Sequence, residues 1–395
     1  MSTGETVRMP LFTDGGAELL EWMRHMRDEQ PLWQDERGHY FVFRYADVQE
    51  VFSDPARFSS NIGRLMPVFG EEKLSANLPW QDPPDHRKLR QLVSQAFTPK
   101  TVAAMRPRIG EIVAELLAAA PDDSFDFVEY LAYPLPVIVI AELLGISPAD
   151  RAFFRACADR LLGIRADDSE SDEAAAKAIA DATKELDEYL VAEVRRRRSA
   201  GSSGDVLGAL AAAELDGERL TDLQVATFAA LLLNTGHITT TLMLGNTLLC
   251  LADAPEAEAR IRADRSLVPA ALEEVVRWRP PFPRALRIAT EELELAGGVV
   301  PANGIVMPSI LSANHDERQF REPERFDIDR DPNRHVGFGH GIHFCLGAPL
   351  ARLETEIALN GLLDAFGELR ATDDAVFHDS EFYGVKKLTV SARRS

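Results

Sequence analysis

One cysteine of this chain has surroundings suited to holding a metal centre. Cys345 lies in the segment HVGFGHGIHFCLGAPLARLE, residues 335–354, between a glycine-rich stretch and the predicted start of a helix. A thiolate is a far stronger metal ligand than a thiol, and glycines let the backbone approach a sulfur atom closely. The N-terminus of the following helix favours negative charge on that sulfur. A cysteine buried in a tight turn is the alternative, and it is the interpretation for Cys157 and Cys250.

Two further pairs of residues have the spacing of neighbours on a helix surface. Glu274 and Arg277 are three apart, which places a carboxylate and a guanidinium on the same side of a helix. A solvated surface pair of this kind stabilises little. His86 and Arg90 are four apart in the basic segment HRKLRQLVSQAF, residues 86–97, and also share one face.

The segment around Cys345 resembles a known family signature. Residues 338–347, FGHGIHFCLG, match the haem-binding pattern FxxGxxxCxG of the cytochrome P450 superfamily. The resemblance implies that Cys345 is the thiolate ligand of haem b, and that Phe338, Gly339 and Gly347 belong to the haem-binding loop. Cysteine thiolate is the haem ligand that favours cleavage of the O–O bond.

Other parts of the chain resemble the family in the expected order. Glu274-Val275-Val276-Arg277 is similar to the family's ExxR motif, and the resemblance implies that Arg325, in the segment PERFDIDR, completes this structural network. It also implies that the haem propionates are bound by His86, Arg90, Arg287 and His343. Charge-assisted hydrogen bonds suit that task.

The resemblance extends over roughly the whole chain, so the family's fold is expected with it. We therefore predict a mainly α protein with a minor β part, in which haem lies between a long central helix and the Cys345 loop. Residues 1–395 are predicted to form one domain, and no internal repeat or interdomain linker is evident.

The segment Thr235-Gly236-His237-Ile238-Thr239 resembles the oxygen-binding part of the family's central helix. Gly236 would allow close approach of dioxygen, and Thr239 matches the threonine that supports proton delivery. Ile238 departs from the family, which usually has Asp or Glu there. One hypothesis is that water held by the hydroxyls of Thr235 and Thr239 replaces this acid, since residues four apart share a face. The alternative is that Thr235 hydrogen-bonds to a carbonyl of its own helix.

The resemblance also suggests where a substrate binds. The irregular, apolar segment at residues 62–80 is similar to the family's loop over the distal haem face, and residues 162–175 are predicted to be part of a mobile lid. A mainly apolar lining suits a bulky, mainly apolar substrate. The candidate pocket residues are Leu65, Met66, Val68, Phe69, Leu78, Leu232, Phe282, Phe382 and Tyr383.

The predicted function is that of a haem-thiolate monooxygenase. It would insert one oxygen atom of O2 into a bulky natural product by hydroxylation or epoxidation, and by analogy with actinobacterial biosynthetic members we expect a macrolide or other polyketide. The alternatives are a peroxygenase or oxidative-rearrangement enzyme on the same scaffold, suggested by Ile238, or a non-catalytic haem-binding accessory protein.

The chain has no flavin or iron–sulfur domain of its own, so electrons from NAD(P)H would come through a ferredoxin reductase and a ferredoxin. Basic residues near the Cys345 loop are candidates for docking an acidic ferredoxin, although scattered solvated charges are an equal alternative. These residues are Arg87, Lys88, Lys100, Arg106, Arg108, Arg334, His335, His340 and Arg352. A monomer is expected.

Charge and composition exclude several other classes of protein. The net charge of -20 over 395 residues disfavours non-specific nucleic-acid binding. The 3 cysteines form no disulfide framework, and no secretory signal is evident, so a cytoplasmic location is predicted. The apolar stretch at residues 231–252 has the length of a membrane span. Its asparagines, histidine and threonines instead predict a helix through the centre of a large domain.

These sites require a particular set of elements to position them. Helices are predicted near residues 17–30, after residue 45, at 86–97, almost continuously from there to about 280, and again after Cys345. The segment HYFVFRY and the stretch from about 280 to 310 have the pattern of short strands.

Overall fold

The structure is a computed structural model that describes residues 8–65, 71–161, 172–201, 204–372, 374–378 and 382–394. Its first helices are α1 (Ala17–Glu29), α2 (Tyr45–Ser53), α3 (Glu71–Ala76), α4 (Asp85–Ala96), α5 (Pro99–Ala104), α6 (Arg106–Ala119), α7 (Pro134–Leu143) and α8 (Arg151–Leu161). The later ones are α9 (Asp172–Ala200), α10 (Val206–Ala212), α11 (Asp222–Asp253), α12 (Pro255–Ala263), α13 (Val268–Trp278), α14 (Ile310–Asn314) and α15 (Ala348–Ala365).

The strands form two larger sheets and three hairpins. The five-stranded sheet has the order β1 (Leu32–Gln34), β2 (Tyr40–Val42), β10 (Ile305–Pro308), β7 (Arg287–Ala289), β3 (Phe58–Ser59). The three-stranded sheet has the order β11 (Phe366–Ala371), β14 (Thr389–Arg394), β4 (Ser124–Asp126). The hairpins are β5 (Glu214–Leu215) with β6 (Glu218–Arg219), β8 (Leu293–Leu295) with β9 (Gly298–Val300), and β12 (Val376–Phe377) with β13 (Val385–Lys387).

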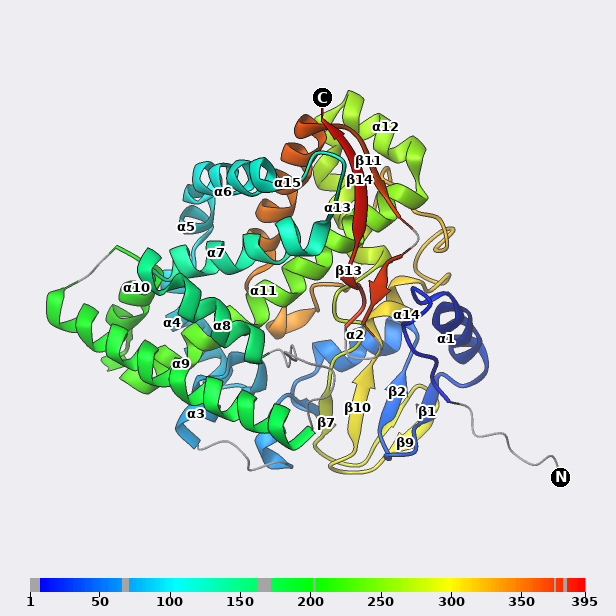
Figure 1. Cartoon of the computed structure of the whole chain (residues 1–395). Coiled ribbons are helices and arrows are strands. Elements are labelled where there is room, and N and C mark those ends of the chain that lie inside the picture. Colours follow the sequence, from blue (N-terminus) through cyan, green and yellow to red (C-terminus); the bar gives the residue numbers. More distant parts are fainter. Residues whose placement is uncertain are drawn as a thin grey trace.

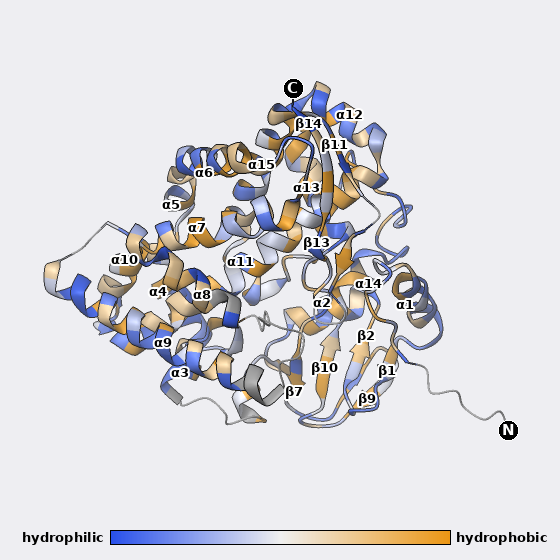
Figure 2. Ribbon diagram, viewed as in Figure 1, coloured by the Kyte–Doolittle hydropathy of each residue, from blue (hydrophilic) through white to orange (hydrophobic). Residues whose placement is uncertain are grey.

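The predicted fold class is confirmed. Most of the long helices lie together, with α11 among them against α7, α9 and α15, and the five-stranded sheet lies to one side with α1, α2 and α14 (Figure 1). The sheet is antiparallel except where β10 runs parallel to β2, with Val306 opposite Tyr40. In Figure 2 apolar residues line the inner surfaces of both parts, as expected for elements that share a core.

The central helix α11 owes its length and position to its sequence. Thr221 caps its N-terminus, and the Thr221 hydroxyl and the Gln224 side chain satisfy each other's backbone N–H groups in a capping box. Apolar residues lie all around the helix beyond its first turns, which is the pattern of a buried helix. Among the described residues, no helix meets the length and hydropathy that a bilayer crossing requires.

Several short elements were not predicted. Within the segment expected to be irregular, α3 forms a helix, and 3-10 turns flank it at Ile62–Arg64 and Leu78–Trp80. The three-stranded sheet was also missed, because β4 lies more than 200 residues before β11 and β14 and pairs with β14 only in the folded chain, with Phe125 opposite Val390.

Candidate active site

The loop that carries Cys345 is anchored by several of its backbone N–H groups. The Val336 N–H donates to the Asn314 side chain at 2.8 Å, the Gly339 N–H to the Val336 carbonyl at 2.8 Å, and the Cys345 N–H to the Phe338 carbonyl at 2.9 Å. We call residues 335–347 the Cys loop. Its hydrogen bonds hold the cysteine directly before the first turn of α15.

Two glycines let this loop pack against its neighbours. Gly341 has φ of 70°, and a β-carbon there would lie 2.6 Å from the Phe52 carbonyl oxygen. A β-carbon on Gly337 would lie 2.7 Å from the Val276 carbonyl oxygen of α13. Both contacts are with backbone atoms that cannot move aside, so only glycine fits at these two positions.

The Cys345 sulfur lies deep in the molecule and is nevertheless open on one side. Burial raises the pKa of the thiol above its usual value, while the backbone N–H groups of Gly347 and Ala348 and the charges of Arg90 and Arg352 lower it. The side chain is exposed even so, which means that it borders a hollow rather than packed protein. A deep thiol with one open side and backbone donors behind it has the surroundings of a metal ligand.

A group of basic side chains lies beside the Cys loop. The rings of His86 and His343 are tilted against each other with centroids 4.4 Å apart, and Ser60 hydrogen-bonds to Nε2 of His343 at 3.0 Å. Strand β7 places Arg287 here, opposite Val306 of β10. Arg90 of α4 donates to the carbonyls of Ile342 and Phe344 at 3.0 and 2.8 Å, so it also braces the loop.

Among the described residues, Asp82 is the acid whose charge acts on this basic cluster, at His86 and Arg287. Burial is the largest cause that lowers the pKa of His343 to about 3 and of Arg287 to about 10, followed for His343 by repulsion from Arg287. In the part of the chain that the structure describes, neither Arg90, Arg287, His86 nor His343 forms an ion pair, and Nε2 of His86 has no hydrogen-bond partner. The cluster therefore fits a ligand that brings negative oxygen atoms.

A fully buried ion pair supports the loop from behind. Arg277 donates to both carboxylate oxygens of Glu274, at 2.7 and 2.8 Å, and both side chains have 0% exposure. Arg277 also donates to the carbonyls of Asn314 and Pro323 at 2.8 and 3.0 Å. Charges buried to this degree need such complete hydrogen bonding.

The prediction that Arg325 completes this network is wrong. Its side chain is 65% exposed and meets only Glu322, at 3.8 Å. Arg330 takes the role instead: it is 8% exposed, and its Nε donates to Glu274 at 3.1 Å. Arg325 contributes only its carbonyl, which accepts from Arg277 and Arg330. The turn after the PERF segment directs the later arginine inward, which spacing alone does not reveal.

The threonines of α11 hydrogen-bond within their own helix. The Thr235 hydroxyl donates to the Leu231 carbonyl at 2.7 Å, and the Thr239 hydroxyl donates to the Thr235 carbonyl at 2.8 Å. This arrangement matches the alternative given for Thr235 above. Thr235 is exposed although it lies in the middle of a central helix, while Ile238 is buried. This face of α11 therefore borders a hollow, and Gly236 packs against Ile140 of α7.

The predicted pocket residues divide into three groups. Leu65 and Phe282 are exposed large apolar side chains, and the rings of Phe282 and Phe382 are 5.4 Å apart. Leu78, Leu232 and Tyr383 are core residues instead, so their assignment to the pocket is wrong. Met66, Val68 and Phe69 lie outside the described residues, as does most of the predicted lid at 162–175.

The residues that do not line the pocket pack in the core instead. Leu78 packs in the main core near Leu89 and Leu92 of α4. The Tyr383 hydroxyl donates to the Gly15 carbonyl at 2.9 Å, and its ring lies 5.1 Å from that of Phe12. Tyr383 thus joins the C-terminal segment to the N-terminal one. Leu232 is buried in the main core as well.

A short segment covers the start of α11. We call residues 71–80 the α3 segment. Glu72 accepts from the Thr221 hydroxyl at 2.6 Å, Ser75 accepts from Gln224 at 3.0 Å, and Lys73 pairs with Asp187 of α9. All three contacts use side chains that water reaches, whereas Ala76 and Leu78 of the same segment are buried, Leu78 in the main core.

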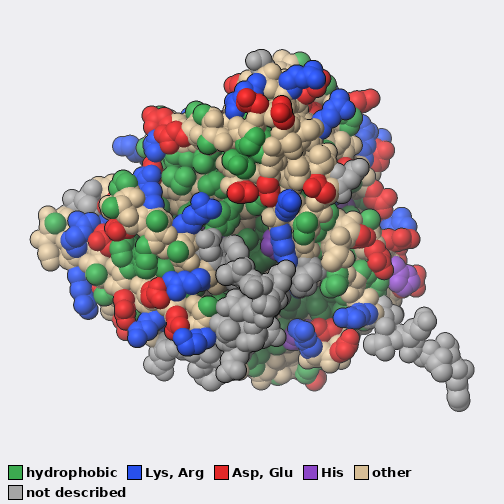
Figure 3. All heavy atoms as spheres, in the orientation of Figure 1, with side chains coloured by type: hydrophobic (Ala, Val, Ile, Leu, Met, Phe, Trp, Pro, Cys, Tyr) green, Lys and Arg blue, Asp and Glu red, His purple; other side chains and the backbone are tan. Residues whose placement is uncertain are grey.

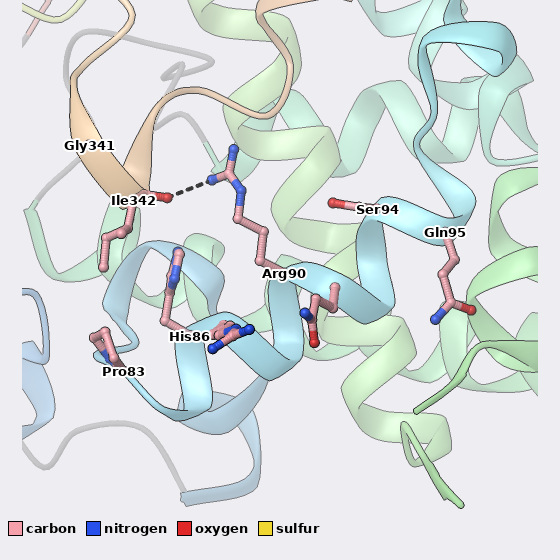
Figure 4. A pocket seen from close by; sticks show the side chains of 9 residues that line it. Pro83, His86, Arg90, Ser94, Gln95, Gly341 and Ile342 are labelled. Carbon is pink, nitrogen blue, oxygen red and sulfur yellow. Dashed lines mark hydrogen bonds between the residues drawn. The ribbon is translucent and has the colours of Figure 1, made fainter. Parts of the chain in front are cut away.

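A groove of about 620 Å³ runs along the outer face of α4 beside the tip of the Cys loop (Figure 4). Figure 4 shows Arg90 reaching from α4 toward the loop, where it bonds the Ile342 carbonyl. The groove is lined by Pro83, His86, Arg87, Arg90, Gln91, Ser94, Gln95, Gly341 and Ile342.

Most of the other basic residues proposed for docking are already paired with acids. Lys88 pairs with Glu218, Arg106 with Glu356, Arg108 with Glu142 and Arg352 with Glu273. Figure 3 shows acidic and basic side chains mixed over one face of the molecule. Among the described residues, the lining of the α4 groove includes two cationic side chains, Arg87 and Arg90, and no acid.

The chain is similar in sequence and in structure to known proteins of one family. Residues 170–376 match the family model for cytochrome P450. The chain is 45% identical over 363 residues to cyclomarin C epoxidase CymV of Salinispora arenicola, covering 91% of each chain. It is 44% identical to erythromycin C-12 hydroxylase of Saccharopolyspora erythraea, covering 90% of this chain and 89% of that one. The ligand-free structure of cytochrome P450 TbtJ1 superposes with a TM-score of 0.91 at 47% identity, covering 98% of this chain and 100% of that one.

Proposed function

The chain belongs to the cytochrome P450 family and is a monooxygenase of natural-product biosynthesis, and we propose that Cys345 is the thiolate ligand of its haem b. The observation that carries this proposal is the deep sulfur of Cys345, which faces a hollow and receives backbone N–H groups from Gly347 and Ala348. Thiolate-ligated haem activates dioxygen with two electrons from a partner and inserts one oxygen atom into the substrate.

The basic cluster supplies what the haem propionates require. His86, Arg90, Arg287 and His343 would bind the two carboxylates, which would add negative charge beside a cluster whose nearby acid is Asp82. The donors of Arg90 are divided between this task and the carbonyls of the Cys loop. Residues 1–395 would form one domain around this group.

A substitution of the ligand tests the haem assignment directly. Cys345→Ser removes the sulfur and leaves the loop's backbone hydrogen bonds in place. We expect the variant to lose the absorption band that thiolate-ligated haem gives with carbon monoxide, and with it all monooxygenase activity. Cys250→Ser, at a buried cysteine of α11, serves as the control and keeps that band. An unchanged band in Cys345→Ser would exclude Cys345 as the ligand.

The substrate we propose is a macrolide or other polyketide. The exposed apolar side chains of Leu65 and Phe282, the latter in contact with Phe382, support a bulky, mainly apolar molecule. Titration of the ferric protein with macrolactones, cyclic peptides and terpenoids, followed by the haem Soret band, separates these classes. A saturable shift with macrolactones alone is expected, and a shift with cyclic peptides alone would replace the polyketide assignment.

A ferredoxin, reduced by its NAD(P)H-dependent reductase, would supply the electrons and dock in the α4 groove. Arg87 and Arg90 give that groove positive charge in a chain whose net charge is -20. Acidic ferredoxins would be attracted to it, more strongly at low salt. Arg87→Glu is expected to slow ferredoxin-supported turnover, whereas Lys100→Glu, a substitution of the same charge outside the groove, serves as the control.

One feature favours a peroxygenase as the second candidate. Ile238 is buried where the family usually has an acid, and the hydroxyl protons of Thr235 and Thr239 are directed at helix carbonyls. Use of hydrogen peroxide would need less proton delivery by α11. Product formation from hydrogen peroxide at a rate comparable to the ferredoxin-supported reaction would establish this second function.

A further inference from the structure

Three side chains form a connected set behind the Cys loop. Arg352 of α15 makes a two-point ion pair with Glu273 of α13, through contacts of 2.6 and 2.8 Å. Nε2 of His335 lies 3.1 Å from the same carboxylate. Nδ1 of His335 accepts the backbone N–H of Gly337 at 3.1 Å. Glu273 therefore joins a residue of the loop to a residue of the helix that follows it.

This set contacts the loop at the residue that fixes the cysteine backbone. The Arg352 guanidinium lies 4.4 Å from the centre of the Phe338 ring, within the range of a cation–π contact. The carbonyl of Phe338 accepts the Cys345 N–H at 2.9 Å. Arg352 thus contacts the side chain of Phe338, and the backbone carbonyl of the same residue holds the backbone of Cys345.

Arg352 presents a positive charge to the sulfur, and Glu273 carries the negative charge that pairs with Arg352. Arg352 is one of two arginines whose charge lowers the pKa of the Cys345 thiol. The pKa of Glu273 is held at about 2: burial raises it, and the stronger combined effect of His335 and Arg352 lowers it. Glu273 is therefore an anion at neutral pH, and it offsets the positive charge that Arg352 presents to the sulfur.

We propose that Glu273 and Arg352 are positioning residues that set how strongly the Cys345 sulfur donates electrons to the haem iron, and hence the reduction potential of the haem. The proposal rests on the assignment of haem to Cys345. Without the anion, the uncompensated guanidinium would draw electron density toward itself and stabilise the reduced iron. Without the cation, the remaining anion would do the opposite.

The test measures the haem reduction potential in three variants of the holoenzyme. Glu273→Gln removes the anion, and its potential is expected to be more positive than that of the unaltered protein. Arg352→Met removes the cation but keeps much of its apolar stem, and its potential is expected to be more negative. Glu273→Gln/Arg352→Met removes both charges, and its potential is expected to return close to the original value.

The signs of these shifts separate electrostatic tuning from a purely structural role. A loosened loop would move both single variants in the same direction and the double variant further, and that result would overturn the proposal. Both side chains are about one third exposed, so the shifts should shrink as salt is added. Shifts that do not depend on salt would also count against it.

A control that removes the same charge is available on α15, the helix that carries Arg352. Asp364→Asn removes one negative charge near the far end of α15, where the side chain pairs with Arg265 and is 75% exposed. Its potential should equal that of the unaltered protein, and a shift as large as that of Glu273→Gln would show a general charge effect instead. The carbon monoxide band is recorded for every variant. Its absence from the unaltered protein would contradict the haem assignment, whereas its presence with unchanged potentials would contradict only this inference.

Discussion

The Cys loop and the helix α3 are held by different kinds of contact. Behind the loop, Glu274 and Arg277 form a fully buried network whose donors and acceptors come from several segments. The polar contacts of α3 are made by side chains at the surface, among them Lys73 and Asp187. The network behind the loop is therefore built to stay in place, whereas the polar contacts of α3 can break at low cost.

This difference matches the tasks of the Cys loop and of α3. A thiolate ligand must keep its position within a fraction of an ångström, which requires a supporting layer of side chains whose own positions are fixed. Entry of a bulky substrate requires part of the protein to move. Surface ion pairs contribute about 0–1 kcal/mol, so contacts such as those of α3 can break and reform during each turnover.

The largest expected effect comes from breaking the buried network. Arg277→Met leaves the Glu274 carboxylate buried without its main partner, and removal of one member of a buried pair costs about 3–5 kcal/mol. We expect a large fall in the free energy of unfolding and loss of haem at mild urea concentrations, measured by circular dichroism and the Soret band. A loss below about 1 kcal/mol would show that the network is dispensable.

The next effect tests which arginine completes that network. Arg330→Met removes two contacts to Glu274 together with bonds to three backbone carbonyls, and about 1–3 kcal/mol of stability should be lost. Arg325→Met, five residues earlier at an exposed position, should change stability by less than about 0.5 kcal/mol. The same urea titration decides between them, and equal losses would restore the original prediction for Arg325.

Acid should weaken the side of the molecule that holds the loop. Burial is the main cause that lowers the pKa of His315, next to α14, to about 3 from an ordinary value of 6.5. Below pH 6.5 the unfolded chain binds a proton that the folded chain excludes. Stability should thus decrease as the pH falls, by up to about 1.4 kcal/mol per pH unit for this residue. His315→Asn should reduce that slope, and an unchanged slope would contradict the assignment.

The smallest effect should be seen in kinetics rather than stability. Lys73→Met removes the ion pair between α3 and α9, and the free energy of unfolding should change by less than about 1 kcal/mol. Stopped-flow binding of a bulky azole to the haem should become faster, while binding of imidazole, which is small, should not. Lys184→Met removes an exposed ion pair with Glu188, within α9 alone, and is the matched control. Equal rates for the azole in both variants would show that the pair does not restrain α3.

The sequence predicted the Cys loop and its supporting network better than the region around α3. Motif spacing was enough to find the Cys loop, α11 and the pair Glu274–Arg277, because local geometry and nearby residues determine those features. It was not enough for Arg330, whose contact with Glu274 depends on how a distant turn folds back. A pair of adjacent acids, Glu273 and Glu274, was the only sequence signal for the second ion pair of α13.

Apolar residues were the hardest to assign. A leucine or tyrosine in a segment near the substrate has the same sequence appearance whether it faces the hollow or the core. Leu78 and Tyr383 face the core, and only their packing partners show this. Thr235 illustrates the opposite case, because its exposure on a central helix reveals the hollow more clearly than its residue type does.

The way in which α3 is attached also bears on how such enzymes acquire new substrates. The polar side chains of α3 have three partners outside the helix among the described residues: Asp187 on α9, and Thr221 and Gln224, the two residues that cap α11. A gene fragment encoding a different α3 segment could therefore be exchanged between related chains, provided that it kept the three matching polar side chains and the buried residues Ala76 and Leu78. Diversification at this position would leave the iron-binding half of the molecule untouched.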